Sequence, residues 1–442
     1  MSLTQFTSPE NVSKIFDFWT TFKITIPINE RTDHLEPRST PITIVDARMG
    51  RGKSSAAIRY MNEHRNDKRF LYITPFLDEV DRICQRCDFD QPDSDHLCKS
   101  TELKNHLRRG HNVSATHSLF YLMDEEALQL VRDMHYSLIV DESIQVVERV
   151  MVTDKDLELI TTHLADVDEH GIVHWRDPEY TGKLTGYKEI ADTGSLLKLD
   201  SVLFNILNPG VLCSFEEVFM LTYMIEGQYQ KAYLDFFGFS YKVVGVEEDG
   251  NGFRFSDKPD MPPPVDFGRM IHIADKKLPN GIGDDYYSLS KNWYAKRKYE
   301  SKDIRALRNG MRNFFVANPD GSSGTRLWTC YKNDIDKLVD LRTKRYKSNF
   351  LQIGARATNE YRDRTDIAYM ANRFADPNIA KFFLSRGVTI DKDKFALSEM
   401  LQWIWRSAIR DGKSINLYIP SRRMRELLTE WIKENNGGTA CE

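Results

Sequence analysis

The stretch Pro41-Ile-Thr-Ile-Val-Asp-Ala-Arg-Met-Gly-Arg-Gly-Lys-Ser54 is the most informative part of the sequence for the fold. A short apolar run rich in β-branched residues leads into a glycine-rich turn, and residues 55–64 then follow a helical period. A strand, a glycine-rich turn and a helix in this order are typical of the opening of a parallel α/β sheet. We therefore predict an α/β protein.

Further apolar runs, separated by stretches with a helical period, predict two parallel-sheet units. In the first half of the chain these runs are residues 69–75, 111–117, 136–141 and 218–223. In the second half they are residues 269–274, 325–330, 349–353 and 414–419, followed by a closing helix over residues 422–434.

The pattern predicts domain 1 over residues 1–240, a linker over residues 241–265 and domain 2 over residues 266–442. The linker is expected because its pattern is irregular and because it contains three consecutive prolines. Residues 151–205 interrupt the alternation of apolar runs and helical stretches in domain 1. The first 50 of these residues hold 11 acidic and 5 basic side chains. We expect this stretch to be an insertion, or a largely helical subregion.

Composition limits the possible functions. The chain has 442 residues and a formal charge of −4, which excludes a uniformly basic nucleic-acid binder, so any such contact must come from a local patch. No apolar run reaches the ~18–20 residues of a membrane helix, and the first residues do not resemble a secretion signal. Six scattered cysteines do not form a disulfide framework. We expect a cytoplasmic protein without a membrane partner.

The loop after the first predicted strand has the residues that triphosphate binding needs. Its glycines let the backbone N–H groups of Arg48, Met49, Gly50, Arg51 and Gly52 approach phosphates. Lys53 can reach the β- and γ-phosphates, and the hydroxyl of Ser54 can hold Mg²⁺ at the start of a helix. The alternative is a basic glycine turn without a ligand. We expect ATP and Mg²⁺ as cofactors.

Two adjacent carboxylates, Asp141 and Glu142, end the apolar run 136–141. In P-loop ATPases the first such acid holds Mg²⁺, normally through water, and the second polarises the attacking water. Two solvated acids at a strand end are the alternative. The combination with the glycine-rich loop favours an ATPase.

Together these motifs resemble those of superfamily-two helicases of the DExx type. Asp141-Glu-Ser-Ile144 stands where well-known members have Asp-Glu-Ala-Asp or Asp-Glu-x-His, and the P-loop of that superfamily opens with alanine, as Ala47 does here. The resemblance implies two RecA-like domains with parallel sheets and a central ATP cleft over about residues 40–420. The unusual residues in these motifs favour a divergent, phage-borne member of the family, which would act in the host cytoplasm.

The resemblance also implies nucleic-acid contacts and an arginine finger. Thr74 and Pro75, and likewise Thr116 and His117, stand where the family contacts the nucleic-acid backbone. The stretch from Gln402 to Arg410 resembles the last family motif. In it Gln402 would face the nucleotide, and Arg406 or Arg410 would supply the finger.

Two departures from that last motif leave the choice of arginine open. Trp405 replaces the motif glycine, and Arg410 comes one residue late. A helix beginning near Ser398 would place Gln402, Arg406 and Arg410 on one face, because they are four residues apart.

A basic and aromatic stretch lies within residues 291–350, which hold 15 Lys and Arg residues against 6 acidic ones. Basic side chains meet phosphates and aromatic rings stack on bases, so Lys296, Arg297 and Lys298 are candidates for a single-stranded track. Solvated helix faces explain the same composition equally well.

Four potential zinc ligands, Cys84, Cys87, His96 and Cys98, lie close together in the sequence. We expect their spacing to be incidental and predict no zinc on this set. The preferred function is an ATP-dependent nucleic-acid helicase or translocase that acts on DNA. The alternatives are a DNA-packaging-type ATPase motor and a non-unwinding nucleic-acid-binding ATPase.

Overall fold

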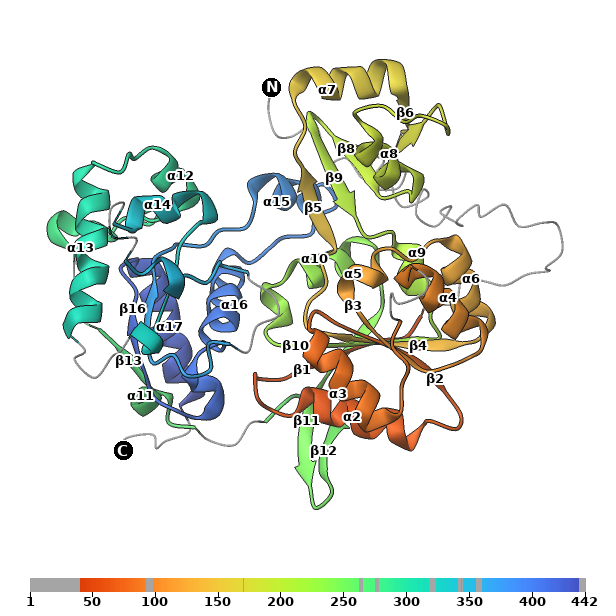
Figure 1. The fold of residues 1–442 in the computed structure, drawn as a ribbon, viewed down its shortest axis with the longest axis horizontal. Helices are drawn as coiled ribbons and strands as arrows, with labels where there is room; N and C mark the ends of the chain where they lie inside the picture. The colour runs from red at the N-terminus through yellow and green to blue at the C-terminus, as the bar shows by residue number, and fades with distance from the viewer. Residues whose placement is uncertain are drawn as a thin grey trace.

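The computed structural model describes residues 40–92, 98–169, 171–261, 265–274, 278–317, 323–340, 343, 345–354 and 360–436. Two α/β units lie side by side, and a smaller inserted unit protrudes above the first of them (Figure 1). The α/β fold class with parallel sheets, predicted from the sequence, is confirmed.

The first unit is built on a seven-stranded sheet with the order β12-β11-β1-β10-β4-β2-β3. The neighbours from β11 to β3 are parallel, and only the pair β11 and β12 is antiparallel. The strands are β1 (Ile42–Asp46), β2 (Arg69–Thr74), β3 (Val113–Thr116), β4 (Tyr136–Asp141), β10 (Glu217–Thr222), β11 (Tyr241–Asp249) and β12 (Gly252–Ser256).

Helices cover both faces of this sheet because successive strand residues point to opposite sides. Leu71 and Ile73 belong to one core, whereas Phe70 and Tyr72 belong to the core on the other face. Helices α2 (Lys53–Glu63) and α3 (Leu77–Cys87) contribute buried side chains to the second of these cores. The first core is covered by α4 (Lys99–Arg108), α5 (His117–Phe120), α6 (Glu125–Asp133), α9 (Pro209–Cys213) and α10 (Tyr229–Phe236).

Strands β11 and β12 occupy residues that were expected to be a linker. Val244 and Val246 of β11 are buried in the core that α2 covers, and β11 pairs in parallel with β1. This tertiary pairing makes the stretch a strand. The irregular pattern arises because the far half of β11 pairs only with β12, in a hairpin where charged residues are exposed.

The second unit has a four-stranded, wholly parallel sheet with the order β13-β16-β15-β14. Its strands are β13 (Ile271–Ile273), β14 (Arg326–Thr329), β15 (Asp366–Tyr369) and β16 (Ile415–Tyr418). One face packs against α12 (Lys291–Ala295), α13 (Lys302–Ala317) and α14 (Ile335–Leu338), and the other against α11 (Phe267–Met270), α16 (Lys392–Ile404) and α17 (Arg422–Asn435). Residues 349–353, predicted as a strand, do not form one. Phe350 makes one isolated bridge to Trp328, and β15 and β16 are the two central strands.

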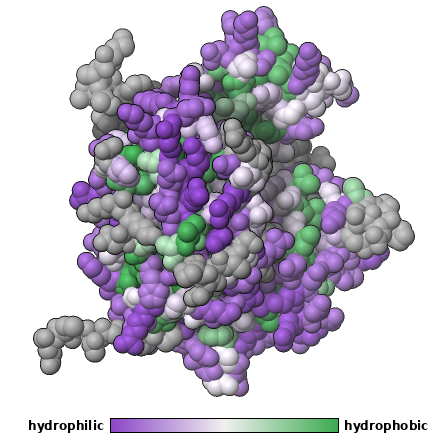
Figure 2. Space-filling model, turned by 60° about the vertical axis from the view of Figure 1, so that its left-hand side comes forward, coloured by the Kyte–Doolittle hydropathy of each residue, from purple (hydrophilic) through white to green (hydrophobic). Residues whose placement is uncertain are grey.

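The inserted unit follows β4 and has a small core of its own. It contains strands as well as helices, so the expectation of a largely helical subregion is wrong. Its elements are β5 (Val147–Val150), α7 (Asp154–Leu159), β6 (Ala165–Val167), β7 (Val173–Trp175), α8 (Thr185–Asp192), β8 (Leu196–Leu199) and β9 (Val202–Ile206). The space-filling view shows a mainly hydrophilic surface, with hydrophobic residues on this protruding unit and in smaller patches elsewhere on the same face (Figure 2).

Helix α15 (Pro377–Leu384) fixes the two large units against each other. It follows β15 of the second unit, but its Phe382 and Phe383 are buried in a core of the first unit beside Phe236. A second close approach is at Gly227, where an added Cβ would lie 2.4 Å from the carbonyl oxygen of Lys394. None of the helices in the described ranges is long and apolar enough to cross a membrane.

Truncating the α15 anchor should loosen this arrangement. Phe383→Ala removes a fully buried ring and should lower the free energy of unfolding by about 3–5 kcal/mol, measured by urea denaturation followed by circular dichroism. The neighbouring Leu384 is 57% exposed, so Leu384→Ala is the matched control and should change stability by less than about 0.5 kcal/mol. Equal effects of the two variants would contradict this packing.

Candidate functional site

The candidate site lies at one edge of the first sheet, where parallel strands end. β1, β10 and β4 are adjacent and parallel, so Asp46, Thr222 and Asp141 at their carboxyl ends lie along the same edge. The loop of residues 47–52 follows β1 and leads directly into α2 at Lys53. The register therefore brings this loop beside the acidic pair that follows β4, although 88 residues separate Lys53 from Asp141 (141 − 53).

The glycine-rich loop needs its glycines for two different reasons. Gly50 and Gly52 have φ values of 80° and 75°, in the left-handed region that favours glycine. Gly52 also leaves room for a ring, since an added Cβ would lie 2.4 Å from Phe253 on β12. Lys53 Nζ folds back over the loop and donates to the carbonyl oxygens of Ala47 at 2.5 Å and Arg48 at 3.3 Å.

Asp141 is the best-connected buried acid of the site. One of its carboxylate oxygens accepts hydrogen bonds from Ser54 Oγ at 3.2 Å and Tyr72 Oη at 2.7 Å, and its backbone carbonyl contacts His117 Nε2 at 3.0 Å. Burial, and then the charge of Glu142, raises the pKa of Asp141 to about 7. The Ser54 hydroxyl and the Asp141 carboxylate offer oxygen ligands, which Mg²⁺ prefers. Burial makes this carboxylate costly to ionise, and a cation beside it would offset that cost.

Glu142 stands in an unusual backbone conformation. Its φ is 64°, although it is not glycine, and its N–H donates to the carbonyl oxygen of Leu221 at 3.1 Å. Such conformations persist where the surrounding structure enforces them, and they cluster at functional sites. Burial lowers the pKa of Lys53, and the charges of Glu142 and Asp141 oppose that shift. The lysine and the two acids therefore share one electrostatic environment.

A large cavity adjoins this edge of the sheet and lies between the units. Its volume is about 1210 Å³, and its walls come from the first, inserted and second units. The lining includes Pro75, Glu142, Arg149, Tyr286, Tyr287, Lys291, Arg373, Gln402 and Arg406. Residues 47–54 do not line it. Arg48 instead lies 4.9 Å from the ring centre of Phe267, and Met49 packs against the core of the second unit.

The structure separates the two candidate finger arginines. Gln402 and Arg406 both line the cavity, and the Arg406 guanidinium lies 5.5 Å from the ring centre of Phe76. Helix α16 ends at Ile404, and Arg410 lies exposed in a separate short helix, Ala408–Asp411. The single helix expected from Ser398 to Arg410 is therefore wrong, because the chain turns after Trp405.

Of the residues expected to contact nucleic acid, three serve the first unit itself. Thr74 is fully buried, the Thr116 side chain accepts from Leu119 N–H at the start of α5, and the buried His117 supports Asp141. Pro75 alone of these four residues lines the cavity.

The candidate basic track lies at the end of α12. Lys296 and Lys298 are exposed, whereas Arg297 pairs with Asp303 at 2.6 Å and lies 3.9 Å from the ring centre of Trp293. None of the three lines the cavity, but Lys291 at the start of the same helix does.

Several contacts around the loop carry no recognisable sequence signal. Asp260 accepts from the Arg48 N–H at 3.2 Å and pairs with Arg51 at 3.3 Å, across about 210 residues of sequence. Asp46 accepts from the N–H groups of Met224 and Ile225 at 2.8 and 3.1 Å. Tyr72 and Asp141 lie on the same face of the neighbouring parallel strands β2 and β4, but Tyr72 pairs in register with Ile139, so their hydrogen bond depends on the fold and not on a local pattern.

The cysteine set is spread over different elements. Cys84 and Cys87 lie on α3, Cys98 precedes α4, and these three are free thiols. His96 lies outside the described residues.

Comparisons with known proteins identify relatives of the chain. Residues 265–432 match a family model described as the YonV C-terminal Rossmann-like domain. A solved chain named XPD_APO is similar over 89% of this chain and 96% of its own length, with 10% identity and a TM-score of 0.47. The SPbeta prophage-derived uncharacterized protein YonV of Bacillus subtilis (strain 168) is 36% identical over 411 residues, which cover 89% of this chain and 98% of that protein. The chain therefore belongs to the YonV family.

Proposed function

We propose that this protein is an ATP-dependent nucleic-acid translocase or helicase, with DNA as the favoured substrate. The observation that carries the proposal is the meeting of Lys53, Ser54, Asp141 and Glu142 at the ends of two parallel strands. This is the arrangement that P-loop ATPases need. The prophage origin named for the relative favours action in the cytoplasm of a bacterial host.

In this proposal each side chain has one task. The N–H groups of residues 48–52 and the Lys53 ammonium bind the phosphates of ATP, and Ser54 and Asp141 hold Mg²⁺, which supplies charge neutralisation when bound. Lys53 must leave its carbonyl partners to do so, a short movement of a flexible side chain. Glu142 orients a water molecule and accepts its proton. Arg406, from the opposite unit, stabilises the charge that develops on the transferred phosphoryl group.

The cavity between the units offers a path for a single strand. Tyr286 and Tyr287 line it with 48% and 67% of their surfaces exposed, and aromatic rings of this kind stack on bases. Arg149 and Lys291 add exposed positive charge on the walls. We assign residues 1–240, extended by β11 and β12, and residues 266–442 as the two domains whose relative movement would shift the strand.

The first test separates ATP binding from hydrolysis. Lys53→Ala should abolish both, because the phosphates lose their lysine, whereas Glu142→Gln should keep binding and abolish turnover, because the amide cannot accept a proton. Fluorescent-nucleotide titration measures the first property and phosphate release the second.

Lys433→Ala, an exposed lysine on α17, is the control and should behave as the wild type in both assays. Near-normal turnover in Lys53→Ala would exclude the proposed ATP site. Loss of nucleotide binding in Glu142→Gln would exclude only its role as the base.

The second test compares alanine variants of Arg406 and Arg410, the two arginines of the last motif. Arg406→Ala should reduce nucleic-acid-stimulated turnover by at least about a hundredfold with little loss of ATP affinity, since arginine fingers contribute on the order of 10³–10⁵. Arg410→Ala, on the exposed short helix, should stay within about twofold of the wild type. A crippled Arg410→Ala beside a mild Arg406→Ala would assign the finger to Arg410.

The third test concerns the basic track. Each lost phosphate contact should lower the slope of log affinity against log salt by about 0.7 for a single strand. Lys296→Glu combined with Lys298→Glu should therefore lower the slope by up to about 1.4. Arg297 is left intact because of its pair with Asp303. Binding of labelled oligonucleotides over a salt series measures the slope, and an unchanged value would place the track along Lys291 and the cavity instead.

A further inference from the structure

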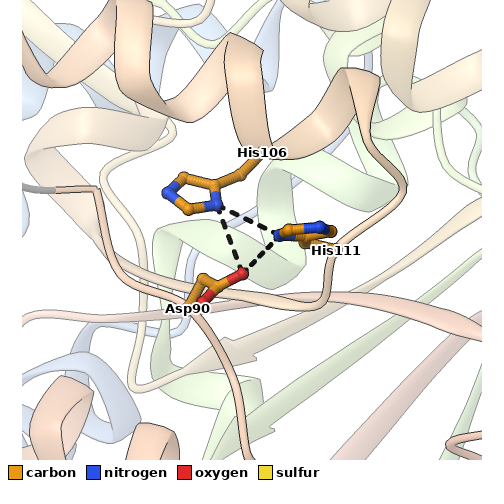
Figure 3. Close-up of side chains that lie close together, drawn as sticks. All are labelled: Asp90, His106 and His111. Atoms are coloured by element: carbon orange, nitrogen blue, oxygen red, sulfur yellow. Dashed lines mark hydrogen bonds and ion pairs between the residues drawn. The ribbon is translucent and has the colours of Figure 1, made fainter.

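Three potential metal ligands converge on the far edge of the first sheet, away from the candidate ATP site. Asp90 lies in the loop after α3, His106 in the last turn of α4, and His111 just before β3 (Figure 3). One carboxylate oxygen of Asp90 lies 2.5 Å from His111 Nδ1 and 3.3 Å from His106 Nδ1, and the two Nδ1 atoms are 3.4 Å apart. All three ligand atoms therefore face one point.

The backbone holds these three residues in place without help from their side chains. Asp90 N–H donates to Asn112 O at 2.9 Å, and Ser114 N–H donates to Asp90 O at 2.9 Å. Both backbone groups of Asp90 are therefore bonded to the start of β3. His111 N–H donates to His106 O at 3.2 Å, which closes the turn between the two histidines. A site whose ligands are positioned by backbone pairing is largely preformed.

The distances suit a metal ion better than hydrogen bonds alone. In a tetrahedral zinc site with bonds of about 2.0–2.1 Å to nitrogen and oxygen, neighbouring ligand atoms lie about 3.4 Å apart. Two of the three separations match that value, and only the pair of Asp90 and His111 is closer. The Nδ1 atoms of His106 and His111 both face one carboxylate oxygen of Asp90. A divalent cation can lie between these three atoms.

An outer carboxylate completes the pattern. Glu102, one turn before His106 on α4, places Oε2 3.9 Å from His106 Nε2, the nitrogen that points away from the cluster. A histidine that binds a metal through one nitrogen commonly directs its other N–H to a carboxylate, which fixes the ring and its tautomer. Glu102 is within a small side-chain movement of that role.

From this geometry we infer that Asp90, His106 and His111 form a site for a divalent transition metal, with Zn²⁺ as the best match. Imidazole and carboxylate ligands suit Zn²⁺, and a water molecule is the fourth ligand, because no cysteine sulfur or further His, Asp or Glu atom of the described residues joins the cluster. The ion ties the loop after α3, the end of α4 and the edge strand β3 together. The inference is independent of the proposed ATPase function.

The experiment titrates Zn²⁺ into the full chain after removal of metals with a chelator, using a competing chromophoric chelator as the readout. The wild type should bind one equivalent, and Zn²⁺ should raise its melting temperature. Loss of an outer carboxylate partner typically lowers metal affinity by roughly 10–100-fold, and Glu102→Gln should fall within that range. His106→Ala and His111→Ala each remove a direct ligand and should lower the Zn²⁺ affinity further. Lys53→Ala should bind Zn²⁺ as the wild type does.

His135→Ala is the matched control, because His135 pairs with Glu216 at 3.1 Å but forms no three-ligand group with other described residues. It should bind Zn²⁺ normally. His106→Gln and His111→Asn repeat the test with side chains that retain hydrogen bonds, and circular dichroism checks their fold. X-ray absorption should show nitrogen and oxygen ligands only.

Three results would overturn the site. These are no Zn²⁺ uptake by the wild type at micromolar concentrations, unchanged affinity in folded His106 and His111 variants, or zinc–sulfur distances near 2.3 Å, which would move the metal to the cysteines.

Discussion

The buried carboxylate of Asp141 is the constraint on which the rest of the site depends. The folded protein binds its proton more tightly than the unfolded chain does, since the pKa rises from 3.8 to about 7. This group therefore lowers the stability of the folded state as the pH rises from about 4 to about 7, by on the order of 4 kcal/mol. Tyr72 and Ser54 offset part of that cost through hydrogen bonds, and a divalent cation would offset more.

The same edge of the sheet is tied to the second unit, so the site and the interface between the units are one structure. Met49 packs against the second core, Arg48 lies over Phe267, and Tyr223 accepts a hydrogen bond from the Trp431 indole at 2.9 Å. Helix α15, which lines the cavity, reaches back from the second unit into the first core. A change in the loop after β1 therefore acts directly on contacts that position the second unit.

Local patterns were sufficient for the strands and loops that carry the site. β1, β2, β4 and β10 are short apolar runs that end in a polar residue, and their bounds agree with the prediction within one or two residues. Elements that depend on distant partners were not predictable. β11 is a strand because β1 lies beside it, and just after α16 ends at Ile404 the Ala408 N–H donates to the carbonyl oxygen of Arg364 at 3.0 Å. Asp90, His106 and His111 show no motif, since they come together only when the loop after α3 pairs with β3.

Glu142 shows how the fold accommodates a residue that local preferences disfavour. A bulky acidic residue in the left-handed region costs of order 1–3 kcal/mol, so the neighbouring structure must hold it there. The adjacent Ser143 does so in part, because its hydroxyl contacts Gln228 and Thr222, and Gln228 in turn donates to the carbonyl oxygen of Tyr223 at 2.8 Å. These contacts link the turn after β4 to the segment after β10. The position of the Glu142 carboxylate at the cavity wall is therefore set by β10 as well as by its own strand.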